Sequence, residues 1–268
     1  MIDLLQITND PEVARRCDAL DGMRLFVDLE SLGKAERQAG RSTFISAHKL
    51  EDVRRVKSVL RRTRLMVRVN PLNPNSQTEV DDVLAMGADW LMLPMFRSAA
   101  ELQCFVAMVA GRAPVVPLLE TSEALQTLEE WIDTPGLIEV FVGLNDLHLS
   151  LGQRFMFEPL VCGLIEKVAH AAHMRGLRFG FGGIARHDEG LLPGRDVLAE
   201  HLRLGSQAVI LSRTFHRDAP MTSLEQGVAA LRAEECVLVQ RSSQEMEFDR
   251  LRVNEAIATI SKTLRRCA

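Results

Sequence analysis

Short apolar runs alternate with longer amphipathic segments from one end of the chain to the other. Uninterrupted apolar runs are typical of buried parallel strands, and apolar positions recurring every three or four residues are typical of helices. The predicted strands are 2–7, 24–30, 65–70, 90–95, 115–121, 138–146, 177–183 and 208–212. The predicted helices are one beginning at Pro11 and then 49–62, 79–86, 98–110, 122–135, 160–174, 196–204, 223–240 and 244–264. Eight strands, each followed by a helical segment, predict a (β/α)8 TIM barrel.

The end of the chain carries one helix more than closure of such a barrel requires. We expect 223–240 to complete the barrel and 244–264 to be an additional C-terminal helix, which could cover the bottom of the barrel or reach a neighbouring subunit. A barrel of roughly 250 residues accounts for nearly the whole length, so we expect 1–268 to form a single domain. An open doubly wound sheet is the alternative, but no GxGxxG turn follows the first strand.

Composition bears on the binding partners and the cellular location that we expect for this protein. The formal net charge of −4 gives no support to a nucleic-acid partner, and no segment approaches the roughly 20 uncharged apolar residues that span a bilayer. The five cysteines form no CxxC pair, and residues 1–5 lack the basic flank of a signal peptide. We therefore expect a cytoplasmic protein that binds neither nucleic acid nor membrane.

Two acidic residues end neighbouring predicted strands. Glu120 closes the strand 115–121, and Asp146 closes the strand 138–146. Strands joined by a helix lie parallel, so their carboxyl ends share one edge of the sheet and the two carboxylates lie close together. Each acid could instead cap the helix that follows it. Two adjacent carboxylates repel each other unless a cation lies between them, so the pair predicts a divalent metal with oxygen ligands, Mg2+ or Mn2+.

Arg68 lies inside a predicted strand that is otherwise apolar. A guanidinium keeps its charge, so it must meet an anion: the carboxylate of a substrate, or a barrel acid such as Glu30 or Glu120. One metal and one arginine together suit a 2-oxo acid that chelates the metal through its carboxylate and carbonyl oxygens. The metal would then stabilise the enolate that forms when a C–C bond breaks or a proton leaves the α-carbon.

Two glycines and an arginine lie where the predicted seventh and eighth strands end. Gly182 and Gly183 end the seventh strand, and Arg213 follows the eighth. Loops at this corner of a barrel often bind anions, so we expect these three residues to contact the substrate, although glycines there could simply permit tight turns.

Four motifs in the first two thirds of the chain carry a family resemblance. They are VRVNP at 67–71, ADWLMLP at 88–94, LETSEA at 119–124 and GLNDLHLSLG at 143–152. In this order they resemble the HpcH/HpaI aldolase and citrate lyase β-subunit family of the phosphoenolpyruvate/pyruvate-binding barrel superfamily. The resemblance implies a homo-oligomeric (β/α)8 barrel that uses Mg2+ or Mn2+. It also implies that Glu120 and Asp146 bind the metal, while Arg68 binds the carboxylate or enolate oxygen of the oxo acid.

The second predicted strand departs from one branch of the family. Class II pyruvate aldolases carry a histidine directly after their Asp-x-Glu motif, whereas Asp28-Leu29-Glu30 is followed here by Ser31, closer to the citrate lyase and malyl-CoA lyase branch. We expect Asp28 to contact the substrate and Glu30 to act in catalysis. His48, in the long loop after this strand, could supply the missing acid–base group if that loop folds inward. Asn70, at the end of the third strand, is expected to bind substrate.

The sequence thus predicts a metal-dependent carbon–carbon lyase of the aldolase type. Its expected substrates are a pyruvate- or oxaloacetate-like 2-oxo acid and an unidentified aldehyde or thioester. Two alternatives stay open: an acyl-CoA lyase that acts on a citryl- or malyl-CoA-like thioester, and a non-catalytic barrel that binds a small acid.

Overall fold

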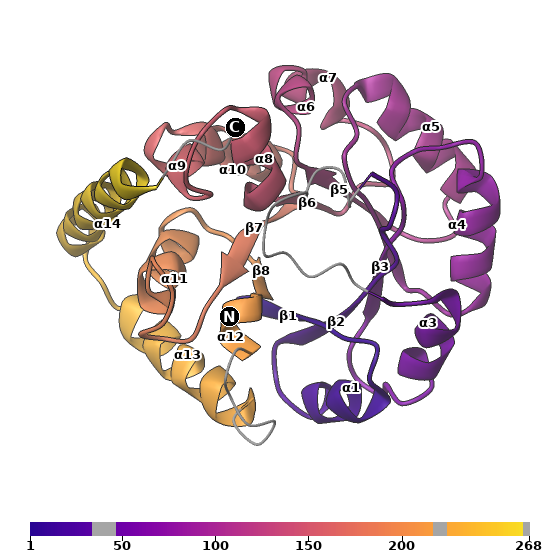
Figure 1. Cartoon of the computed structure of the whole chain (residues 1–268), viewed down its shortest axis with the longest axis horizontal. Helices are drawn as coiled ribbons and strands as arrows, with labels where there is room; N and C mark the ends of the chain where they lie inside the picture. Colours follow the sequence, from indigo (N-terminus) through magenta and orange to yellow (C-terminus); the bar gives the residue numbers. More distant parts are fainter. Residues whose placement is uncertain (34–46, 217–223, 265–268) are drawn as a thin grey trace. The chain divides into compact units, whose positions relative to one another are not determined.

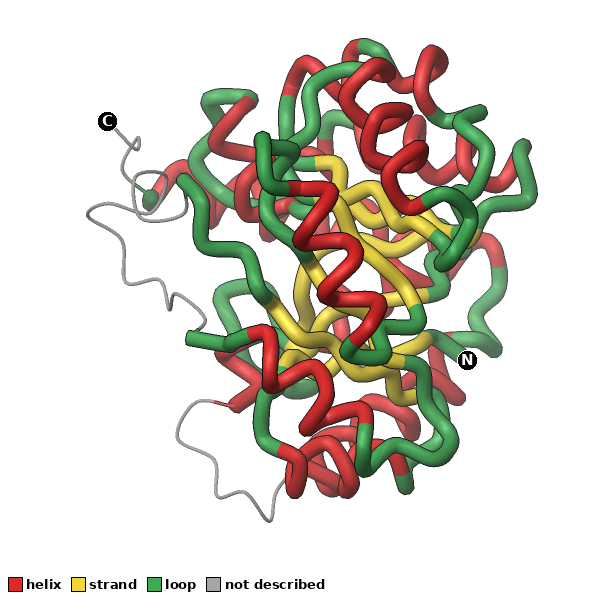
Figure 2. The backbone as a smooth tube through the Cα atoms, turned by 90° about the vertical axis from the view of Figure 1, so that its right-hand side faces the viewer, coloured by secondary structure: helices red, strands yellow, loops and turns green. Residues whose placement is uncertain are grey.

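The computed structural model describes residues 1–33, 47–216 and 224–264, and its eight strands close into a barrel in chain order. The strands are β1 (Asp3–Ile7), β2 (Met23–Asp28), β3 (Leu65–Arg68), β4 (Trp90–Leu93), β5 (Val115–Leu119), β6 (Glu139–Val142), β7 (Arg178–Ile184) and β8 (Ala208–Leu211). Red helices and yellow strands alternate along the tube of Figure 2. The predicted (β/α)8 TIM barrel is therefore confirmed.

Contacts divide the chain into two compact units, and Leu5–Phe141 is one of them. Its helices are α1 (Pro11–Asp18), α3 (Leu50–Lys57), α4 (Ser76–Ala85), α5 (Ala99–Val109), α6 (Ser122–Gln126) and α7 (Leu128–Trp131). In Figure 1, α1, α3, α4 and α5 follow one another along the outer side of the strands of this unit. Each helix buries one apolar stripe; α5, for example, buries Leu102, Phe105 and Val109, which recur at helical spacing.

The other unit comprises Met1–Leu4 and Val142–Ala268. Its helices are α8 (Leu144–Ser150), α9 (Glu158–Val161), α10 (Leu164–Met174), α11 (Gly194–Arg203), α12 (Arg213–His216), α13 (Leu224–Leu238) and α14 (Ser243–Thr263). The last of these is the predicted additional C-terminal helix. It begins with a capping box between Ser242 and Glu245, and it buries Val253 and Ile257 while packing beside α9 and α11.

Three of the differences from the predicted elements follow from local backbone or side-chain chemistry. The predicted strand 138–146 ends at Val142, because Gly143 turns the chain and the apolar residues after it recur at helical spacing in α8. The predicted helix 122–135 divides at Thr127, whose hydroxyl donates to the Glu123 carbonyl (3.0 Å). The predicted helix 160–174 gives way to α9 and α10, separated by Gly163 with a left-handed φ of +70°.

Hydropathy along the described helices gives one further result. None of them combines the length and the apolar character needed to cross a membrane.

Candidate active site

Strand register brings Asp28 and Arg68 together. The two residues are Cα partners where β2 pairs in parallel with β3, so their side chains leave adjacent strand ends on the same side. Arg68 Nε donates to Asp28 Oδ1 and Arg68 Nη2 donates to Asp28 Oδ2, both at 2.8 Å. This bidentate contact uses one edge of the guanidinium, formed by Nε and Nη2, and fixes the orientation of the group.

Two more acids surround the same guanidinium. Arg68 Nε lies 3.5 Å from Glu30 Oε2, and Arg68 Nη1 lies 4.0 Å from Glu120 Oε1. The predicted ion pairs with Glu30 and Glu120 are both present, but Asp28 is the nearest partner. Burial alone would lower the pKa of Arg68; the three carboxylates outweigh it and hold that pKa above its ordinary value.

The charge balance of this group suits a divalent cation. Asp28, Glu30 and Glu120 are at most 3 % exposed, so among the described residues three buried carboxylates face one guanidinium. Carboxylate oxygens are the ligands that Mg2+ and Mn2+ prefer, and Mg2+ commonly takes only one or two from the protein. The described residues contain no group of three or more His, Cys, Asp or Glu arranged for metal binding. A divalent cation at this group would therefore take most of its ligands from substrate and water rather than from the protein.

Asp146, the other predicted metal ligand, lies in the second unit. It is half-buried in the first turn of α8 rather than at the end of a strand, since β6 stops four residues earlier.

His48 contacts the backbone of the acid cluster, the name used here for Asp28, Glu30 and Glu120 around Arg68. The backbone N–H of Asp28 donates to His48 Nδ1 (3.1 Å), so the neutral ring carries its proton on Nε2. The start of α3 holds the chain beside it, because Asp52 accepts from the Lys49 backbone N–H (2.8 Å). Residues 34–46 of the preceding loop lie outside the described part of the chain. His48 thus contacts the backbone of Asp28, and its predicted role as an acid–base group stays a prediction.

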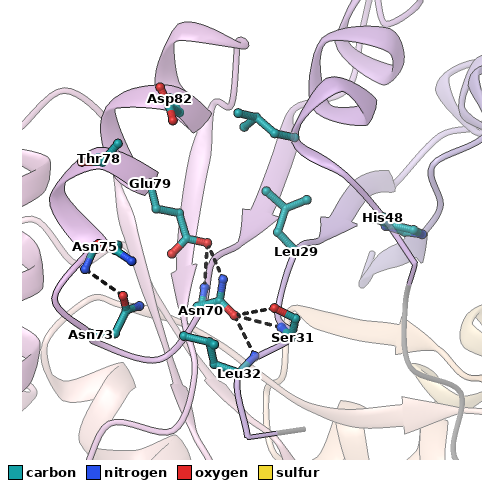
Figure 3. Close-up of a pocket in the computed structure, with 11 residues that line it drawn as sticks. Leu29, Ser31, Leu32, His48, Asn70, Asn73, Asn75, Thr78, Glu79 and Asp82 are labelled. Atoms are coloured by element: carbon teal, nitrogen blue, oxygen red, sulfur yellow. Dashed lines mark hydrogen bonds between the residues drawn. The ribbon is translucent and has the colours of Figure 1, made fainter. Parts of the chain in front are cut away.

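Asn70 uses its side chain within the protein (Figure 3). Its Oδ1 accepts from the backbone N–H groups of Ser31 and Leu32, both at 2.9 Å, and from the Ser31 hydroxyl at 3.2 Å. On its other side, Asn70 Nδ2 donates to Glu79 Oε1 (2.8 Å), as does the Asn70 backbone N–H (3.1 Å). Burial raises the pKa of Glu79 above its ordinary value. This geometry favours a supporting role for Asn70 over the predicted contact with substrate.

A cavity of about 520 Å3 lies at the same junction of β2, β3 and α4. Asn70, Glu79 and His48 line it together with further polar and leucine side chains, as Figure 3 shows. Its acidic residues are Glu79 and Asp82, and no lysine or arginine is among its described lining residues.

The three residues predicted to bind an anion, Gly182, Gly183 and Arg213, belong to the second unit. Gly182 has φ +53°, and a Cβ there would lie 2.8 Å from Leu144 Cδ1. A Cβ on Gly183 would lie 3.3 Å from that of Ser212, and Arg213 is exposed at the start of α12. Packing and backbone conformation thus account for both glycines, and their predicted contact with substrate stays a prediction, as does that of Arg213.

Sequence reasoning missed the contribution of Glu79, which was treated only as the start of a helix. A glutamate in a first helical turn, nine residues after a strand-end asparagine, gives no local sign that the two side chains meet. The contact arises because α4 returns along the strand that precedes it.

Known proteins share both the sequence pattern and the fold of this chain. The family model for HpcH/HpaI aldolase/citrate lyase matches residues 8–185. A hydroxypyruvate/pyruvate aldolase from Rhizorhabdus wittichii is 25 % identical over 146 residues, which are 42 % of this chain and 58 % of that protein. The chain thus spans a little over half the length of this curated relative.

Two solved structures with the same fold are 16 % identical in sequence. An HpcH/HpaI aldolase/citrate lyase family protein from Burkholderia cenocepacia has a TM-score of 0.63, covering 86 % of this chain and 94 % of that one. The citrate lyase β subunit from M. tuberculosis, complexed with oxaloacetate and magnesium, has a TM-score of 0.61, covering 87 % and 96 %. With the family model spanning about two thirds of its length, this chain belongs to the HpcH/HpaI aldolase/citrate lyase family.

Proposed function

We propose that this protein is a divalent-metal-dependent carbon–carbon lyase of the aldolase type, acting on a pyruvate- or oxaloacetate-like 2-oxo acid through an enolate. One observation carries the proposal: Arg68 is held among three buried carboxylates at the carboxyl ends of β2, β3 and β5. Active sites of (β/α)8 barrels form at this end of their strands. That the related citrate lyase β subunit was solved with oxaloacetate and magnesium supports the same substrate class.

Arg68 is the proposed binder of the oxo acid. Asp28 occupies Nε and Nη2, so Nη1 is the nitrogen best placed to donate to a carboxylate or enolate oxygen. Because the fork is already oriented by Asp28, substrate binding would cost little side-chain entropy. Asp28 then acts on the substrate through Arg68.

Glu120 is the proposed protein ligand of the metal from the acid cluster, whereas Asp146 stays a metal ligand predicted from the sequence alone. Bound there, Mg2+ or Mn2+ supplies Lewis acidity that favours the enolate over the keto form. The buried position of Glu120 keeps its oxygens out of bulk water, which strengthens their attraction for a cation.

Glu30 and His48 are the proposed proton-transfer residues. Glu30 lies against Arg68, where its carboxylate can accept a proton from a bound acid. In the conformation that accepts the Asp28 N–H at Nδ1, the neutral His48 ring can donate a hydrogen bond from Nε2 to a substrate oxygen. To transfer a proton, His48 must become the imidazolium, which requires Nδ1 to leave this contact.

The alternative is Claisen-type chemistry on an acyl-CoA, which Ser31 after the Asp-x-Glu motif favours at the level of sequence. Release of pyruvate supports the aldol reaction, and release of free CoA supports the Claisen-type reaction.

The direct test is deuterium exchange at C3 of pyruvate, followed by NMR with Mg2+, with Mn2+ and with a chelator. We expect exchange with either metal and its loss in the chelator. A protein that binds pyruvate but exchanges no deuterium under any of these conditions would be the non-catalytic barrel instead.

A further inference from the structure

A continuous chain of hydrogen bonds connects α4 to the loop after β2. Glu79 Oε1 in α4 accepts from the backbone N–H and from Nδ2 of Asn70. Asn70 Oδ1 accepts from the backbone N–H groups of Ser31 and Leu32. A helix, a strand end and a loop are thereby joined through one amide side chain (Figure 3).

This chain of bonds fixes the backbone around Glu30. On the preceding side, the Leu29 N–H donates to the Arg68 carbonyl (2.9 Å), and on the following side the Ser31 N–H donates to Asn70 Oδ1 (2.9 Å). The Glu30 N–H itself donates to Asp28 Oδ1 (3.2 Å). Three successive backbone amides therefore have fixed partners, and the middle one carries the acid that lies 3.5 Å from Arg68.

We infer that Asn70 and Glu79 are positioning residues, which hold Glu30 against Arg68 without contacting substrate themselves. The inference rests on the proposed function for its catalytic consequence. A misplacement of a reacting group by about 1 Å costs on the order of 100-fold in rate, so a device that fixes the backbone of Glu30 has a measurable effect.

The two side chains have complementary polarity. Asn70 must present an oxygen to the loop and an NH2 group to the helix, and only an amide does both. Glu79 must accept two N–H donors with one oxygen, which a carboxylate does well. The order of amide and carboxylate along the chain of bonds is therefore testable by exchanging them.

The test is an exchange of the two groups, N70D alone and N70D/E79Q together, assayed by pyruvate C3 deuterium exchange with Mn2+. In N70D, two carboxylates meet where Nδ2 and Oε1 are 2.8 Å apart, and we expect kcat to fall about 10- to 100-fold with little change in KM. In N70D/E79Q, the amide on the helix donates to the carboxylate on the strand, but the backbone N–H of residue 70 loses its acceptor. We therefore expect a partial recovery, with kcat at least about threefold above that of N70D.

Glu101→Leu is the matched control. Glu101 Oε2 also accepts a backbone N–H ahead of a helix, that of Arg97 at 2.8 Å, but it is half-buried on α5, away from Asn70 and Glu79 in sequence. We expect its kcat and KM to match those of the parent. A folded N70D with parental kcat, or a folded N70D/E79Q no faster than N70D, would overturn the inference. Should N70D fail to fold, E79Q must retain more activity than E79L, since only glutamine keeps the acceptor oxygen.

Amide hydrogen exchange tests the bonds independently of any activity. In N70A we expect the Ser31 and Leu32 amides to exchange about two- to tenfold faster, the range that the loss of one hydrogen bond gives, with the Arg97 amide unchanged. Unchanged exchange of the Ser31 and Leu32 amides would show that Asn70 does not hold this part of the backbone. If the parent protein catalyses no deuterium exchange into pyruvate while N70A still speeds up the exchange of these amides, the proposed function fails. The positioning of the backbone by Asn70 is then still supported.

Discussion

At the scale of single residues, Arg68 shows how a buried cation organises acids around it. Removing a charge of either sign from such a buried group leaves the opposite charge uncompensated, which typically costs about 3–5 kcal/mol. The bidentate contact with Asp28 makes arginine hard to replace by lysine, whose ammonium cannot contact both carboxylate oxygens in the same plane.

His201 is a buried residue of a different kind, with a consequence for acid stability. It is fully buried, stacks on Phe181 at 3.7 Å and contacts Ser206 Oγ through Nδ1 (2.8 Å). Its Nε2 has no hydrogen-bond partner among the described residues. Burial lowers the pKa of His201 to about 3.

We predict that His201 weakens the fold as the pH falls from about 6.5 towards about 3. In this window the unfolded chain protonates His201 and the folded chain does not, so the free energy of unfolding decreases by up to about 1.4 kcal/mol per pH unit. Above the unfolded pKa the ring is neutral in both states, and this contribution is constant. Urea unfolding at several pH values measures the slope.

His201→Phe keeps the stacked ring on Phe181 and removes the titrating group, so it should flatten that slope. The exposed His170 provides a control, and His170→Gln should keep the parental slope. Equal slopes in the parent and in His201→Phe would show that His201 is not the source.

At the scale of elements, two glycines in and before β7 have a left-handed backbone. Gly182 has φ +53° and is packed against Leu144, the first residue of α8, whereas Gly176 has φ +66° and open space around it. Both positions disfavour an L side chain, but only one is also crowded.

We therefore predict that Gly182→Ala lowers the free energy of unfolding more than Gly176→Ala does. Gly176→Ala should cost about 1 kcal/mol for the left-handed backbone, and Gly182→Ala should add about 1–3 kcal/mol of overpacking against Leu144. Urea titrations of the two variants measure the difference. Equal losses would mean that Leu144 moves aside freely.

Element by element, the sequence predicted what periodicity controls and missed what side-chain chemistry controls. The apolar runs placed all eight strands, and a serine followed three residues later by glutamate marks the start of α14. The end of β6 was predicted too late, because Leu144 and Leu147 continue an apolar pattern that is helical in the structure. The division of two helices at Thr127 and Gly163 depends on local backbone geometry that periodicity does not register.

At the scale of the whole molecule, topology allowed part of the site to be predicted before any coordinates. The sequence predicted that Arg68 would pair with Glu30 or Glu120, and the structure brings both near it together with Asp28, which was not predicted as its partner. The predicted pairing of Glu120 with Asp146 at a metal stays a prediction. The structure also connects His48 to the group through the Asp28 backbone. Asn70 was placed at the correct strand end, but its role could not be predicted because its partner Glu79 comes from a helix.

The central claim is that Glu120 belongs to a metal site on which enolate formation depends. The most direct measurement is a calorimetric Mn2+ titration of Glu120→Gln, paired with pyruvate C3 deuterium exchange on the same sample, with the exposed Glu123→Gln as control. We predict that Glu120→Gln loses both Mn2+ binding and deuterium exchange, while Glu123→Gln keeps both. Parental Mn2+ affinity and exchange in Glu120→Gln would contradict it.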